Sequence, residues 1–246
     1  MASVNLINEW MVFSLILLII WLIIFIFRKN LRKEMFFVSL FTMPLGLTEP
    51  LFVPEYWNPP SLFNLAATTG FDVESLIFSF AIGGIASVLY EMFFRVKHKK
   101  MSKHEMHDKR HRLHLFAILS PIITFLLIEA LFSINPIYSA IIAMFLGSIT
   151  AILCRPDLKK KVLGGGLLFL VLYFVSFVIL NLIYPGFIES TWNLPAVSGI
   201  LFFGVPLEEF LFAFLLGMLW SSIYEHVLGY KLKNKKEKPV SPNNFK

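Results

Sequence analysis

Two adjacent acids, Glu208 and Glu209, are the residues of this chain best placed to do chemistry. They stand in the segment GVPLEEFLFAF, where Pro206 suits the first turn of a helix and an apolar run follows. Ionisable groups within apolar spanning helices usually face the inside of a bundle and mark a working site. A third acid, Glu74, stands in the similar segment DVESLIF.

Neighbouring carboxyl groups can supply both halves of a proton-transfer reaction. A carboxyl group desolvated among apolar side chains keeps its proton near neutral pH, and a carboxylate beside it can remove one. The alternative is structural, because the positive end of a helix dipole favours acids in the first turn. The pair therefore indicates acid–base chemistry, with helix capping as the competing explanation.

Aromatic rings near these acids could stabilise a cationic intermediate. Phe78 and Phe212 each follow an acid by four residues and so share its helix face. A Trp-Asn dipeptide recurs in two loops, where the indoles can also belong to an interfacial aromatic belt and the amides can brace the loop. The candidate substrate-binding residues are Phe212, Phe78, Trp192, Trp57, Asn193, Asn58 and Glu129, the last of which can also turn toward the membrane surface.

The composition places the chain in the membrane class. Of its 246 residues, 57% are hydrophobic and 15% are charged, and the mean hydropathy is +0.73. The expected fold is an all-α integral membrane protein with seven transmembrane helices. The apolar stretches of suitable length run over residues 11–27, 35–53, 73–94, 113–133, 136–153, 165–185 and 206–228.

Positive charge predicts the orientation of these helices. Lys and Arg gather in the loops 28–34, 95–112 and 154–161 and in the tail from Lys231, which all lie on one side. By the positive-inside rule that side is cytoplasmic, so we expect a cell-membrane protein with the N-terminus outside and the C-terminus inside. The basic excess fits anionic lipid headgroups rather than nucleic acid.

The sequence indicates no metal centre and no disulfide. The single cysteine, Cys154, cannot form an internal disulfide or a CxxC motif. Four histidines share the basic loop, where cations would repel a divalent ion, so we expect them in solvent; they are His98, His104, His107 and His111.

Two parts of the sequence resemble each other letter by letter. Pro50, Phe52, Trp57 and Asn58 recur 135 positions later, and Gly70, Glu74, Phe78, Phe80, Gly83, Tyr90 and Glu91 recur 134 positions later. This spacing predicts two three-helix repeats, kept parallel by a linker helix between them. Parallel repeats commonly build a substrate site where they meet. The expected parts are a first repeat over 1–94, a basic loop and linker span over 95–135, a second repeat over 136–228 and a disordered cytoplasmic tail over 229–246.

The PLEEFLF segment, its twin DVESLIF, the Trp-Asn loops and the duplicated unit together resemble the lycopene cyclase domain of archaeal, fungal and some bacterial carotenoid cyclases. The best-matched motif is P-x-E-E-x-x-F at Pro206, Glu208, Glu209 and Phe212. The first repeat departs from it, with Asp72 for the proline and Ser75 for the second acid. The resemblance covers about residues 10–228.

The resemblance implies an isomerase that closes β-rings on a linear C40 carotenoid without net redox change and without a cofactor. An acid protonates a terminal double bond, the next double bond attacks the cation, and a base removes a proton. Glu208 or Glu209 would be the donor, the other the base, and Glu74 a supporting acid. The implied partners are a lycopene-like substrate, membrane lipid and other enzymes of carotenoid synthesis.

Other functions are compatible with parts of the pattern. SWEET-type transporters share the arrangement of three, one and three spans, although this chain has no Pro-Gln dipeptide. A retinal protein is not expected, since every Lys and Arg falls in a loop or the tail. A parallel-repeat transporter and a non-catalytic carotenoid-binding protein remain the alternatives.

Overall fold

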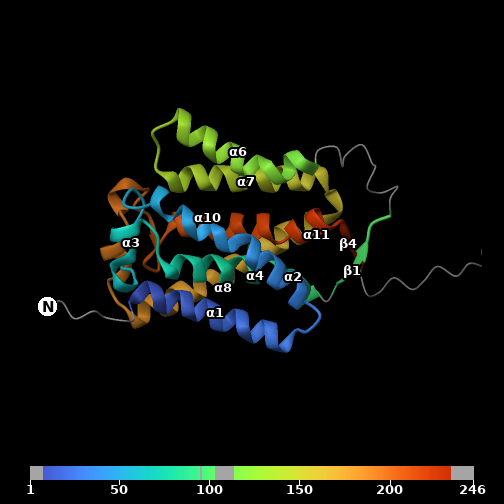
Figure 1. Cartoon of the computed structure of the whole chain (residues 1–246), viewed down its shortest axis with the longest axis horizontal. Coiled ribbons are helices and arrows are strands. Elements are labelled where there is room, and N and C mark those ends of the chain that lie inside the picture. The colour runs from blue at the N-terminus through green and yellow to red at the C-terminus, as the bar shows by residue number, and fades with distance from the viewer. Residues whose placement is uncertain (1–7, 95, 103–113, 234–246) are drawn as a thin grey trace, which may run out of the picture.

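The computed structural model of this chain is a bundle of long helices with loops gathered at its two ends (Figure 1). It describes residues 8–94, 96–102 and 114–233. The longer helices are α1 (Glu9–Phe27), α2 (Arg32–Thr42), α4 (Val73–Phe94), α6 (His114–Leu131), α7 (Pro136–Cys154), α8 (Lys159–Ile183) and α10 (Leu207–Trp220). The short elements are η1 (Met43–Leu51), η2 (Leu62–Asn64), α3 (Leu65–Thr69), β1 (Lys97–Lys100), η4 (Pro156–Leu158), α9 (Phe187–Thr191), η5 (Leu194–Ala196), β2 (Leu201–Phe202), β3 (Val205–Pro206), α11 (Ile223–Leu228) and β4 (Tyr230–Lys233).

Six helical stretches of the described chain are long and apolar enough to cross a membrane. They are Glu9–Phe27, Val73–Phe94, His114–Leu131, Pro136–Cys154, Pro156–Ile183 and Leu207–Leu228. The helical membrane class is therefore consistent with the structure, while the orientation stays a prediction.

The seventh stretch, residues 35–53, does not form one continuous α-helix. It divides into α2 and the tighter 3₁₀ helix η1, which contains Pro44 and Pro50. Proline lacks the N–H that an α-helix would use, so the chain changes its helical form there. The count of seven spans stays a prediction.

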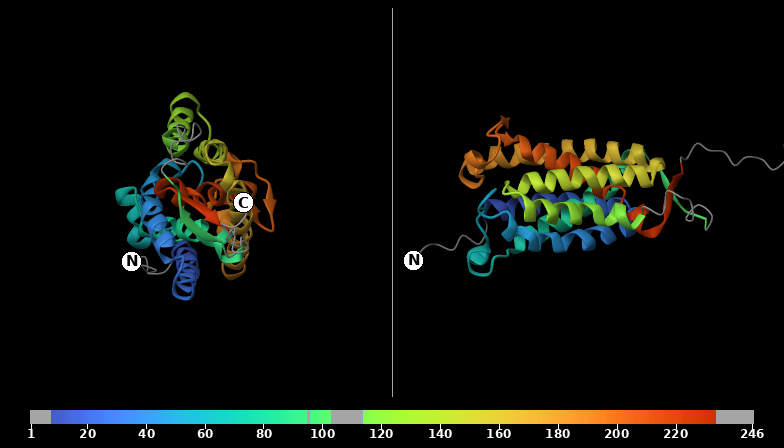
Figure 2. Two further views of the ribbon diagram at one scale, coloured as in Figure 1. Left: turned by 90° about the vertical axis from the view of Figure 1, so that its right-hand side faces the viewer. Right: turned by 90° about the horizontal axis from the view of Figure 1, so that it is seen from above.

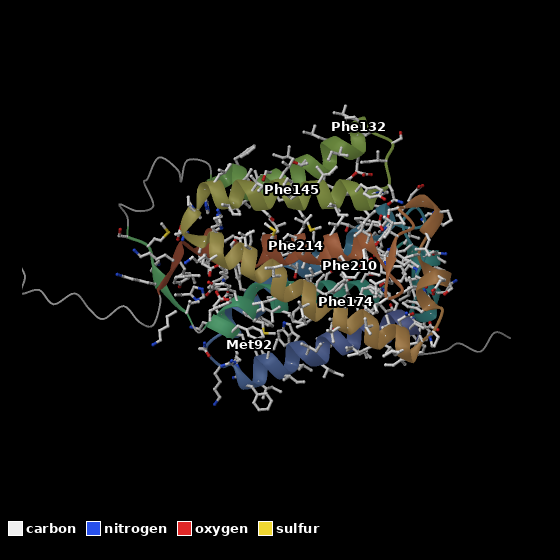
Figure 3. All side chains as sticks on the ribbon, turned by 180° about the vertical axis from the view of Figure 1, so that it is seen from behind. Met92, Phe132, Phe145, Phe174, Phe210 and Phe214 are labelled. Carbon is white, nitrogen blue, oxygen red and sulfur yellow. The ribbon has the colours of Figure 1, made fainter. Side chains whose placement is uncertain are left out.

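Both halves of the bundle pack in the same manner. Helix α2 packs on α4 as α8 packs on α10, and the central helices α4, α8 and α10 contact one another. Phe174 of α8 lies beside Phe210 of α10, with ring centroids 5.0 Å apart (Figure 3). A Cβ atom at Gly83 would lie 2.1 Å from Thr42 Oγ1, and one at Gly217 would lie 2.7 Å from Phe169 Cβ, so both glycines permit close helix contact. This likeness is what an internal duplication predicts.

Helix α6, which covers the predicted linker span, lies at the edge of the bundle. It packs against α7 and stands apart from the other helices in the end-on view (Figure 2). Only 11% of its apolar window is buried. Many of the remaining apolar side chains are available to lipid.

A charged cluster joins the helices at the end opposite the Trp-Asn loops. Lys161, in the first turn of α8, is fully buried, which corrects the expectation that every lysine lies in a loop or the tail. Its Nζ donates to Glu34 at 3.0 Å, to Glu225 at 2.5 Å and to Glu91. Glu91 and Glu225 therefore have a structural role at this end, as ion-pair partners of Lys161.

A two-stranded ribbon covers this cluster. Strand β1 pairs antiparallel with β4, so residues 230–233 are not the disordered tail that the sequence suggested. His98 of β1 is half-buried, not solvated, and its Nε2 lies 2.7 Å from Glu225 Oε1. The same expectation for the other three histidines concerns residues that lie outside the described part of the chain; they are His104, His107 and His111.

Candidate active site

The two Trp-Asn loops meet and pair with each other. Trp57 and Trp192 form an antiparallel backbone bridge. The N–H of Asn58 donates to the Thr191 carbonyl at 2.8 Å, and the N–H of Asn193 donates to the Tyr56 carbonyl at 2.9 Å. The asparagines are exposed and brace the loops.

This pairing turns the loop aromatics inward. Tyr56, Trp57 and Trp192 are 4%, 8% and 4% exposed, and the two indole rings lie 5.2 Å apart. The expectation of an interfacial aromatic belt is therefore wrong for Trp57 and Trp192. Burial between the loops makes them available to a site inside the bundle instead.

Glu209 is the most completely hydrogen-bonded acid among the candidates. Its Oε1 accepts from the Tyr56 hydroxyl at 2.5 Å and from Trp192 Nε1 at 3.0 Å, and its Oε2 accepts from the Tyr173 hydroxyl at 3.0 Å. Burial first, and then the nearby Glu209 carboxylate, raise the pKa of Tyr56 well above its usual value, so this hydroxyl keeps its proton. Three neutral donors stabilise the charged form of the carboxyl group.

Glu208 and Glu74 occupy matching positions in the two halves. Glu208 Oε1 accepts from the Tyr138 hydroxyl at 2.9 Å and from the Ser198 N–H at 3.0 Å. Glu74 Oε1 accepts from Asn8 Nδ2 at 2.7 Å and from the Leu62 N–H at 2.6 Å. In both acids the Oε2 atom is buried without a hydrogen-bond partner. Each carboxyl thus ties a helix start to the loop preceding it.

An apolar cavity of about 610 Å³ lies between α6 and α7 on one side and η1, α4, α8 and α10 on the other. Glu209 is part of its wall. Of the candidate residues, Phe78, Phe212, Trp57 and Trp192 also line it, whereas Glu208, Glu74, Asn58, Asn193 and Glu129 do not. The structure therefore brings one predicted acid and all four predicted aromatic residues to one cavity.

Tyr173 is a contact of Glu209 that the sequence interpretation missed. It lies on α8 four residues from both Phe169 and Phe177, and all three are buried on one face of that helix. That spacing indicates an inward face, but it does not indicate which carboxyl group the hydroxyl reaches.

The comparisons with known proteins agree with this geometry. A family model described as lycopene cyclase matches residues 8–93 and 135–227, which together make up most of the chain. No curated protein and no solved structure matches significantly. The extent of the family match shows that this chain belongs to the lycopene cyclase family.

Proposed function

We propose that this chain is a membrane-embedded carotenoid cyclase that closes β-rings on a linear C40 polyene. The observation that carries the proposal is Glu209, hydrogen-bonded to three aromatic side chains in the wall of a large apolar cavity. Family membership supports carotenoid cyclisation in general. An apolar cavity with a few convergent polar groups is the usual form of a small-molecule site.

The proposed reaction adds one proton and removes one. A proton adds to the terminal double bond and leaves a tertiary cation. The π electrons of the next double bond attack that cation and close a six-membered ring. Loss of a proton from a neighbouring carbon restores a double bond, so no oxidant or reductant is consumed.

Glu209 is the carboxyl group that exchanges a proton with the polyene in this proposal. Glu208 and Glu74 support the site from outside the cavity, by fixing the loops that precede α10 and α4. The rings of Phe78 and Phe212 lie in the same wall and would stabilise the passing cation.

The orientation of the chain belongs to the same proposal. Seven spans in two parallel three-helix repeats would place the Trp-Asn loops outside and the ribbon of β1 and β4 inside. The two matched segments, 8–93 and 135–227, support this division of the chain. The positive charge on the ribbon end supports the cytoplasmic side.

Expression in cells that accumulate lycopene tests the activity. We expect cyclised carotenoid in chromatograms of the pigment extract, and about a hundredfold less or none with Glu209→Gln. The matched control is Glu189→Gln, an exposed acid on α9. Unchanged lycopene with the wild-type chain present in the membrane would reject the cyclase. Lycopene that then co-purifies with the chain would favour the binding protein, and movement of pigment between membranes would favour the transporter.

A further inference from the structure

Glu49 is a second carboxyl group in the wall of the cavity that contains Glu209. It lies in η1 and is 8% exposed, and it lines the same cavity. Its Oε2 is 3.2 Å from Ser75 Oγ. Its Oε1 is buried without a hydrogen-bond partner, although the Trp57 indole interacts with this carboxyl group. The mechanism above gives this group no role.

Ser75 contacts two carboxyl groups, and both contacts can be hydrogen bonds only if one of those groups carries a proton. Ser75 Oγ accepts from Trp10 Nε1 at 3.2 Å, and it lies within hydrogen-bond distance of both Glu49 Oε2 and Asp72 Oδ2. A serine hydroxyl has a single hydrogen and can donate to only one of these oxygens. The second contact is a hydrogen bond only if that carboxyl group carries a proton.

Asp72 is the better carboxylate of the two. Its Oδ1 accepts the Ser75 N–H at 2.5 Å in the first turn of α4. A backbone donor at a helix N-terminus, together with the helix dipole, stabilises a negative charge there. The proton is therefore assigned to Glu49, either on Oε2 facing Ser75 or on the unpartnered Oε1. No Lys or Arg is among the described residues that line the cavity, so no such positive charge there stabilises a Glu49 carboxylate.

Glu49 also supplies what the first half of the chain lacks. Ser75 stands 134 positions before Glu209, where the sequence motif has its second acid. In the fold, Glu49 reaches this serine from η1. Each half thus contributes one carboxyl group to the cavity, and the two differ in their hydrogen bonds: three donors surround Glu209, and one hydroxyl contacts Glu49.

We propose that Glu49 is the proton donor of the cyclisation and that Glu209 is the base. This inference rests on the proposed cyclase function. The Glu49 O–H bond breaks as its proton adds to the terminal double bond, the ring closes, and Glu209 takes a proton from the carbon beside the ring cation. One proton has then moved from Glu49 to Glu209, and exchange with water returns both groups to their starting forms.

Glu49→Gln, which keeps the shape of the side chain and removes the acid, tests the assignment. We expect cyclisation to fall about a hundredfold, while Glu49→Asp recovers at least tenfold over Glu49→Gln. Glu49→Leu is the second variant. An apolar side chain fits an apolar wall, so this protein should accumulate in the membrane even if the Glu49→Gln protein does not. Cyclisation above a tenth of the wild-type rate in either variant that accumulates overturns the proposal. Glu55→Gln, the same change at an exposed acid that does not line the cavity, is the control.

Deuterium incorporation from heavy water distinguishes the proton donor from the base. Membranes holding Glu209→Gln should place deuterium in the recovered linear carotenoid, because protonation continues and reverses, whereas membranes holding Glu49→Gln should place none. Deuterium entering the linear carotenoid with Glu49→Gln would also overturn the assignment. A wild-type chain that converts no lycopene fails at the earlier step and contradicts the proposed function itself.

Discussion

At Glu209, the hydrogen bonds decide which chemical form of the carboxyl group is available. The three donors come from different parts of the chain: Tyr56 from a loop of the first half, Tyr173 from α8 and Trp192 from a loop of the second half. Each is neutral, so the carboxylate is stabilised without a salt bridge. In the proposed mechanism these donors support the charged form of the base in an apolar cavity, where an unsupported carboxylate would take up a proton.

Tyr173→Phe removes one donor and leaves the ring in place. A hydrogen bond to a charged group contributes about 1.5 to 3 kcal/mol, so we expect cyclisation to slow by about tenfold or more. Timed chromatography of pigment extracts measures the rate. Tyr184→Phe, a change of the same kind outside this cavity, is the control. Equal rates in the two variants would show that the Tyr173 hydroxyl does not support the carboxylate.

The residues of the site differ in how far the sequence predicts them. Phe78 and Phe212 follow from helical spacing and from the duplicated motif, and Glu209 follows from its place beside Glu208 at the head of an apolar run. Glu49 and Tyr173 do not, because their roles depend on contacts between elements distant in the chain. The inward turn of Trp57 and Trp192 also needs the loop pairing, since an indole at a membrane interface has the same sequence signature.

At the scale of elements, a buried lysine holds four of them together. Lys161 of α8 contacts acids from α2, α4 and α11, and all four side chains are nearly inaccessible. Breaking a buried ion pair by removing one partner leaves charge without compensation and is strongly destabilising. The cluster therefore ties both halves of the bundle at the end away from the cavity acids.

Lys161→Met should lower the free energy of unfolding by about 3 to 5 kcal/mol, because three buried acids lose their common cation. In detergent this corresponds to a melting temperature lower by roughly 10 °C. Lys160→Met changes the exposed neighbour and is the matched control. Adding Glu91→Gln to Lys161→Met should restore part of the loss. Equal melting temperatures for Lys161→Met and Lys160→Met would contradict a structural role for the cluster.

Elements that depend on periodicity were the most predictable. Six of the seven apolar stretches contain helices long enough to span a membrane. The second stretch breaks into α2 and η1 because proline interrupts α-helical hydrogen bonding, an effect that hydropathy does not register. That break places Glu49 in η1, opposite Ser75. Strand β4 was missed because four residues in a polar tail carry too little pattern to predict pairing with β1.

At the scale of the whole molecule, residues from both halves of the chain line the cavity. Glu49, Tyr56 and Trp57 come from the first half, whereas Glu209 and Trp192 come from the second. The halves also share the loop bridge at one end and the Lys161 cluster and ribbon at the other. Helix α4 of the first half also packs against α8 and α10 of the second half between these ends. None of these contacts depends on the covalent link, so we expect them to hold two separate chains together.

The chain should therefore work when it is divided. Residues 1–102 and 103–246, expressed as two polypeptides in lycopene-accumulating cells, should together give cyclised product, because the contacts between halves do not require continuity of the backbone. Either polypeptide alone should leave lycopene unchanged, since the carboxyl group at Glu49 or that at Glu209 would be missing from the cavity. Co-expression with Glu209→Gln in the second polypeptide is the control and should also be inactive. Cyclised product from one polypeptide by itself would mean that a single half builds the site, and the shared cavity would then not be where the ring closes.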